Sequence, residues 1–199
     1  PSDIEILKPG VKISFLDSIK LVEMRCKEKG VVPVIRDWTH LDYTPSPFKE
    51  KPDYQLTIQA ALRDHFGILS FSTVRHPIDQ FLSLARLTVM QQHLNIDQYL
   101  FGYLEFAKRA KETGFVRYED FTRQPDETLK IICEKLKLTF DPGYKDKWHI
   151  YKNITGDVDG TRATSEIVPL KRREYEPELL KMFQQSPYYQ ESLDLMGYE

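Results

Sequence analysis

Hydrophobic positions along the chain follow two different periods, and segments of the two kinds alternate. Apolar residues recur at helical spacing in seven segments, which are residues 18–29, 54–66, 77–90, 96–111, 125–136, 177–184 and 187–195. Short apolar runs bounded by turn residues predict buried strands at residues 31–35, 68–74 and 115–118. This alternation of helices and strands favours an α/β fold with a largely parallel sheet.

Capping and turn residues indicate where these elements begin and end. Asp17 or Ser18 can cap the first helix, and Gly30 can end it. Pro33 is unfavourable inside the strand predicted at 31–35, because proline has no N–H to donate to a neighbouring strand. Residues 138–175 are predicted to be mostly irregular, and an irregular segment of this length in a compact domain is usually functional or mobile.

Composition narrows the class of protein. The chain has 199 residues, which suits one domain with a sizeable core, and its net charge of −2 provides no basic field for nucleic acid. No apolar run reaches the roughly 18 residues of a membrane span. No signal peptide is visible, so we expect a cytoplasmic protein. Cys26 and Cys133 are expected to be buried free thiols, and no cluster has metal-ligand spacing.

One segment predicts an anion site, and it reads Ser72-Thr-Val-Arg75-His-Pro77-Ile-Asp-Gln-Phe-Leu-Ser83. A buried strand here ends at Arg75, and Pro77 suits the first turn of the helix that follows. Ligands bind at the carboxyl ends of parallel strands, and a helix N-terminus favours anions. The Arg75 guanidinium suits phosphate or sulfate oxygens, and Ser83 can add a hydroxyl donor. The alternative is that Arg75 pairs with a nearby Asp to fix the strand–helix junction.

This segment resembles the 3′-phosphate-binding segment of sulfotransferases, which has an Arg, a Pro and a Ser at the same spacing. A second stretch, Gly114-Phe-Val-Arg-Tyr118-Glu-Asp, is similar to the family's strand ending in Tyr-Glu-Asp before a Pro-led helix. The resemblance implies that Arg75 and Ser83 bind the 3′-phosphate of 3′-phosphoadenosine 5′-phosphosulfate. It also implies that Tyr118 lies near the adenine. From the residues alone, Tyr118 can equally be packing at a strand end.

A third stretch, Val34-Ile-Arg-Asp37-Trp-Thr-His40, is similar to the family's strand that ends in Thr-His. In many cytosolic members this His is the catalytic base, so the resemblance implies that His40 takes the acceptor's proton. Imidazole titrates near working pH, as a general base must. As alternatives, His40 can simply bind backbone, and Asp37 or Asp42 can orient or replace it.

A fourth stretch, Tyr151 to Arg162, is weakly similar to the C-terminal loop that closes over the 3′-phosphate in sulfotransferases. The resemblance implies that Lys152 contributes a cation there, and Arg162 is a further candidate. The basic run 171–173 can supply the cation instead, but three basic residues in a row are more often a solvated turn, so the run is left out of the predicted site.

The resemblance also implies the architecture, a three-layer P-loop NTPase-like fold of the sulfotransferase type with a mostly parallel sheet flanked by helices. We expect one such domain over residues 1–199, N-terminally incomplete, because the family's phosphosulfate-binding loop has no counterpart in the sequence. The nearest candidate, Ile4 to Ser14, is interpreted as a surface turn because its spacing does not fit.

Together these motifs predict a sulfotransferase. It would move a sulfuryl group from 3′-phosphoadenosine 5′-phosphosulfate to a hydroxyl or amine of a small-molecule or carbohydrate acceptor, and release adenosine 3′,5′-bisphosphate without a metal. Two alternatives stay open. One is a non-catalytic nucleotide-binding relative that lost the phosphosulfate loop. The other is a P-loop kinase, which needs a Walker-type loop and a carboxylate that binds Mg²⁺.

Overall fold

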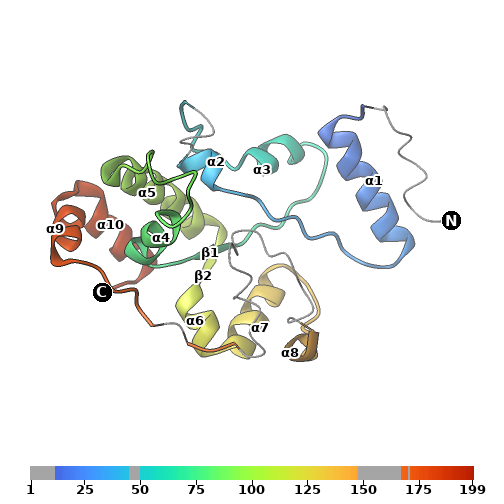
Figure 1. Ribbon diagram of the computed structural model, residues 1–199. Helices are drawn as coiled ribbons and strands as arrows, with labels where there is room; N and C mark the ends of the chain where they lie inside the picture. Colours follow the sequence, from blue (N-terminus) through green and yellow to red (C-terminus); the bar gives the residue numbers. More distant parts are fainter. Residues whose placement is uncertain (1–11, 45–49, 148–166, 170) are drawn as a thin grey trace. The chain divides into compact units, whose positions relative to one another are not determined.

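The computed structural model of the chain divides into two compact units (Figure 1). Unit 1 comprises Pro1–Trp38 and Leu56–Ile68, and unit 2 comprises Thr39–Gln55 and Leu69–Glu199. Every described residue of the predicted site lies in unit 2. The structure describes residues 12–44, 50–147, 167–169 and 171–199.

Unit 1 contains α1 (Phe15–Glu28) and α3 (Thr57–Leu62). Helix α1 begins earlier than predicted because Ser14 caps it, with its Oγ accepting a hydrogen bond from the Asp17 N–H at 3.0 Å. Gly30, at φ +66°, follows the end of the helix, as predicted. The predicted helix is therefore confirmed, with an earlier start.

The strand predicted at residues 31–35 does not form. Residues 31–38 form no regular secondary structure, and Pro33 lies inside this segment. The apolar side chains are exposed at 54% for Val31, 66% for Val32 and 69% for Val34. An apolar run indicates an extended backbone, but a strand also needs a neighbour with which to exchange hydrogen bonds.

Unit 2 contains the strands of the described residues, β1 (Ser72–Val74) and β2 (Phe115–Arg117). They pair in parallel, with Ser72 opposite Phe115 and Val74 opposite Arg117. The predicted three-layer fold with a mostly parallel sheet is therefore wrong, because 55% of the described residues are helical and 4% are in strands. The strand expected at 68–74 pairs over three residues only, since its partner is no longer than that.

Helices surround this short pair of strands. Helices α4 (Pro77–Leu84) and α5 (Ile96–Thr113) form the crossover from β1 to β2 (Figure 1). Pro77 occupies the first turn of α4, as predicted. The remaining helices of unit 2 are α2 (His40–Tyr43), α6 (Tyr118–Arg123), α7 (Pro125–Lys135), α8 (Tyr144–Lys147), α9 (Pro177–Gln185) and α10 (Pro187–Met196).

The core of unit 2 is an aromatic cluster between α4, α5, α9 and α10. Phe183 is fully buried at its centre, and its ring centroid lies 5.4 Å from those of both Phe81 and Tyr189. Ala107 and Ala110 are also fully buried and let neighbouring elements approach α5 closely. These aromatic residues therefore hold α4 and α5, the helices next to the carboxyl end of β1.

Three composition-based expectations can be compared with the described residues. Cys26 and Cys133 are free thiols, as predicted, but each is only half-buried. None of the helices in the described ranges is long and apolar enough to cross a membrane. No group of three or more His, Cys, Asp or Glu in these ranges is placed to hold a metal ion.

Candidate functional site

Two of the predicted site residues meet at the carboxyl ends of the paired strands. Arg75 follows β1 directly, and Tyr118 follows β2 directly. The register that pairs Val74 with Arg117 places these residues next to each other. The Arg75 guanidinium carbon lies 5.4 Å from the centroid of the Tyr118 ring, within the range of a cation–π contact. A cation and an aromatic face are therefore presented together at one end of the sheet.

Arg75 does not pair with Asp79, the nearby aspartate of the helix that follows it. Asp79, in the first turn of α4, is only 2% exposed, and its carboxylate binds residues that are distant in the sequence. Its Oδ2 lies 2.5 Å from Arg172 Nε, and its Oδ1 accepts the backbone N–H of Arg173 at 2.8 Å. Within the described part of the chain, no carboxylate forms an ion pair with Arg75. The guanidinium therefore has donors that an anion can use.

Tyrosines of α5 hold the backbone that carries Arg75. The Tyr103 hydroxyl donates to the Arg75 carbonyl at 2.8 Å, and the Tyr99 hydroxyl donates to the Pro77 carbonyl at 2.8 Å. Burial raises the pKa of both hydroxyls, and the negative charge of Glu119 raises the pKa of Tyr103 further. Both hydroxyls therefore keep their protons and remain donors, which fixes the turn between β1 and α4.

Ser83 lies in α4 and is half-buried. Between described residues, its hydroxyl forms no hydrogen bond. The structure therefore leaves the Ser83 hydroxyl available to a ligand.

His40 is the first residue of α2, which packs on α5. Its Nδ1 lies 3.2 Å from the Thr44 Oγ1. His40 lines a small hollow together with Gln80, Tyr99 and Tyr103. Because Tyr99 and Tyr103 also hold the Arg75 turn, the same part of α5 supports both His40 and the anion-binding segment.

The other predicted cations divide into two groups. Lys152 and Arg162 lie outside the described residues. The basic run 171–173, interpreted from the sequence as a solvated turn, instead reaches the start of α4, where Arg172 also contacts the His76 ring. The partners of this run are too distant in sequence for a local pattern to reveal the contact.

His76 caps α4 as a neutral imidazole. Its Nδ1 accepts hydrogen bonds from the Arg172 guanidinium at 3.0 Å and from the Ile78 N–H at 3.3 Å. Since both partners are donors, Nδ1 carries no proton and Nε2 does. Burial, and then the positive charge of Arg172, lower the pKa of His76 to about 4, while Asp79 acts in the opposite direction.

Unfolding should therefore become easier in mild acid. The folded pKa of His76 lies below the unfolded value near 6.5, so the unfolded chain binds more protons between these two values. The stability that neutral His76 contributes is fully present above the unfolded pKa, and it is lost as the pH falls through this window. The expected loss is about 2 kcal/mol between about pH 7.5 and about pH 5.

Urea unfolding of the natural chain and of His76→Asn at the two pH values measures this contribution. In the variant, an amide oxygen can still cap the helix. The variant should lose less stability on acidification than the natural chain. Equal losses in the two proteins would show that His76 does not titrate as described.

No family model matches the sequence, and no curated protein or solved structure shows significant similarity to it. The functional conclusion therefore depends on the geometry of unit 2 and on the resemblance of its motifs.

Proposed function

We propose that the protein is a sulfotransferase, and that unit 2 binds the 3′-phosphate and the adenine of its nucleotide at Arg75 and Tyr118. One observation carries this proposal. A guanidinium without a carboxylate partner among the described residues lies against an aromatic face at the ends of two paired parallel strands. The motif resemblance assigns these same two residues to the two parts of one nucleotide.

The two side chains suit the two groups chemically. A guanidinium presents parallel N–H donors that match phosphate oxygens, and these charge-assisted hydrogen bonds are stronger than neutral ones. The Tyr118 ring offers a face on which a base can stack. In the free protein the guanidinium itself lies over this ring. Nucleotide binding would move the guanidinium to the 3′-phosphate and free the ring for adenine.

In the proposed reaction, an acceptor hydroxyl or amine attacks the sulfur of the donor. The bond between the acceptor atom and sulfur forms as the bond between sulfur and the phosphate oxygen breaks. His40, whose Nδ1 lies beside the Thr44 hydroxyl, takes the acceptor's proton. The leaving product is adenosine 3′,5′-bisphosphate. Lys152 and Arg162 are proposed as further cations for the nucleotide, and the acceptor as a small molecule or carbohydrate.

Isothermal titration with two nucleotides tests the proposed site. The chain should bind adenosine 3′,5′-bisphosphate more tightly than 5′-AMP, by tenfold or more, because only the former offers a 3′-phosphate to Arg75. Tyr118→Leu should lower both affinities by a similar factor of about ten, since both ligands lose a stacking partner. Equal weak affinity of the natural chain for the two nucleotides would contradict the proposal.

A further inference from the structure

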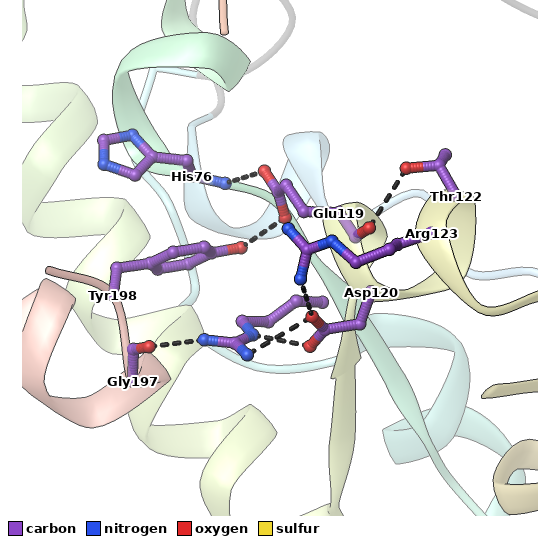
Figure 2. A network of polar contacts seen from close by, with 8 residues as sticks. His76, Glu119, Asp120, Thr122, Arg123, Gly197 and Tyr198 are labelled. Atoms are coloured by element: carbon purple, nitrogen blue, oxygen red, sulfur yellow. Dashed lines mark hydrogen bonds and ion pairs between the residues drawn. The ribbon is translucent and has the colours of Figure 1, made fainter. Parts of the chain in front are cut away.

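Glu119 connects the residues that follow Arg75 and Tyr118 in the chain. Glu119 follows Tyr118 directly, and its Oε1 accepts the backbone N–H of His76, the residue after Arg75, at 2.9 Å. Figure 2 shows this hydrogen bond between the two turns. The Glu119 side chain thus links the turn after β2 to the backbone of the turn after β1.

This bond lies where the strand pairing ends. The last paired residues are Val74 and Arg117, and α6 begins at Tyr118, so the backbone of β2 turns away at this point. The Glu119 carboxylate provides the cross-strand connection one step beyond the ladder. A hydrogen bond to a charged acceptor is roughly twice as strong as a neutral one.

The second oxygen of Glu119 is held by the C-terminal residues. Its Oε2 accepts a hydrogen bond from the Tyr198 hydroxyl at 2.8 Å (Figure 2). Burial, followed by the proximity of the Tyr103 hydroxyl and the negative charge of Glu119, raises the pKa of Tyr198 well above its usual range. The hydroxyl therefore stays protonated and remains a donor, which fixes the carboxylate in one orientation.

Tyr198 is itself fixed on two sides. Its ring centroid lies 5.0 Å from that of His76 in an edge-on contact, and the Arg117 guanidinium lies 5.6 Å from it. Arg117 also donates to the Gly197 carbonyl, and its Nε lies 2.7 Å from an oxygen of Asp120. The orientation of Glu119 is thus determined by contacts from three separate segments of unit 2.

From this arrangement we infer that Glu119 is a positioning residue, which fixes Arg75 relative to Tyr118 and thereby makes the site selective for a 3′-phosphate. The inference rests on the proposed nucleotide site. Glu119 touches neither the phosphate nor the base in this account. It acts through the backbone of His76 and so determines where the neighbouring guanidinium lies.

The test compares Glu119→Ala with Glu119→Gln. The Ala variant removes the acceptor of the His76 N–H, whereas the Gln variant keeps an uncharged oxygen that can accept it. Glu112→Ala is the matched control, because Glu112 is exposed on α5 and pairs only with Arg109 among the described residues. The measured quantity is the ratio of affinities for adenosine 3′,5′-bisphosphate and 5′-AMP, from isothermal titration.

We expect Glu119→Ala to lower this ratio about tenfold, Glu119→Gln to restore most of it, and Glu112→Ala to leave it unchanged. An unchanged ratio in a folded Glu119→Ala chain would overturn the inference. If that variant does not fold, Tyr198→Phe replaces it, since it removes only the second hydrogen bond of the carboxylate. This variant should lower the ratio by a smaller factor, and an unchanged ratio would likewise overturn the inference.

A measurement without nucleotide separates this inference from the proposed function. The Tyr118 ring should shift the NMR resonance of the Arg75 Nε–H upfield in the free protein. Loss of this shift in Tyr118→Leu identifies the ring as its cause. Glu119→Ala should abolish the shift, and a shift that persists would overturn the positioning role. A natural chain that shows this shift without any preference for the bisphosphate would instead contradict the nucleotide site, and with it the role of Glu119 in selectivity.

Discussion

Replacing Arg75 with Ala is expected to weaken binding of adenosine 3′,5′-bisphosphate about a hundredfold. Two charge-assisted hydrogen bonds to one phosphate contribute about 3 kcal/mol together, which corresponds to this factor. Among the described residues, no carboxylate has to be separated from the guanidinium before it binds, and of its described contacts the one with the Tyr118 ring is given up. Affinity for 5′-AMP should change by no more than about twofold, since that ligand has no 3′-phosphate.

Two further variants make the Arg75 measurement specific. Arg75→Lys keeps the charge but lacks the planar guanidinium. Its affinity for adenosine 3′,5′-bisphosphate should therefore fall by an intermediate factor of about ten. Arg86→Ala removes an exposed arginine beyond the end of α4 and should have no effect. An equal loss for Arg75→Ala and Arg86→Ala would mean that only the overall charge attracts the nucleotide.

Gly102→Ala is expected to destabilise unit 2 and to displace His40. Helix α5 passes so close to α2 that a Cβ on Gly102 would lie 1.9 Å from the Tyr43 carbonyl oxygen and 2.9 Å from its carbon. These are backbone atoms, so the clash can be relieved only if α2 moves. Such overpacking costs about 1–3 kcal/mol, although Ala at an ordinary helix position is more stable than Gly.

Thermal unfolding and sulfuryl transfer measure the two consequences of Gly102→Ala. The melting temperature should fall, and transfer should fall further than nucleotide affinity, because the displaced helix α2 carries the proposed base, whereas Tyr99 and Tyr103 hold the Arg75 turn from α5 itself. Gly67→Ala is the control, since a Cβ there meets no atom within 4 Å. Unchanged stability in Gly102→Ala would show that α2 does not pack on α5 as described.

Four of the helices could be predicted closely because their signals are local, whereas α4 ends at Leu84 within the predicted range 77–90, and α3 covers only Thr57–Leu62 of the predicted range 54–66. Apolar spacing and capping residues identified α5, α7, α9 and α10 to within about two residues at either end. Strands depend on a partner elsewhere in the chain. The apolar run at 31–35 does not pair as a strand, and β1 is only as long as β2 allows. The number of strands in the sheet, and hence the fold class, therefore could not be read from the runs themselves.

The candidate site could be predicted from the sequence because the signals of its two residues are also local. Arg75 directly follows one predicted strand and Tyr118 is the last residue of another, so pairing of those strands is enough to bring them together. Glu119, Tyr198 and Arg172 gave no such signal, because each contacts a residue far away in the sequence. A basic run alone indicates exposure, and it cannot reveal a buried aspartate in another helix.

Phosphorus NMR of adenosine 3′,5′-bisphosphate tests the central claim most directly, since the ligand has one resonance for each phosphate. On addition of the natural chain, the 3′-phosphate resonance should shift and broaden, and in the presence of Arg75→Ala this change should be lost. A 3′-phosphate resonance that does not respond to the natural chain, or that responds equally to the Arg75→Ala variant, would contradict the claim that Arg75 binds the 3′-phosphate.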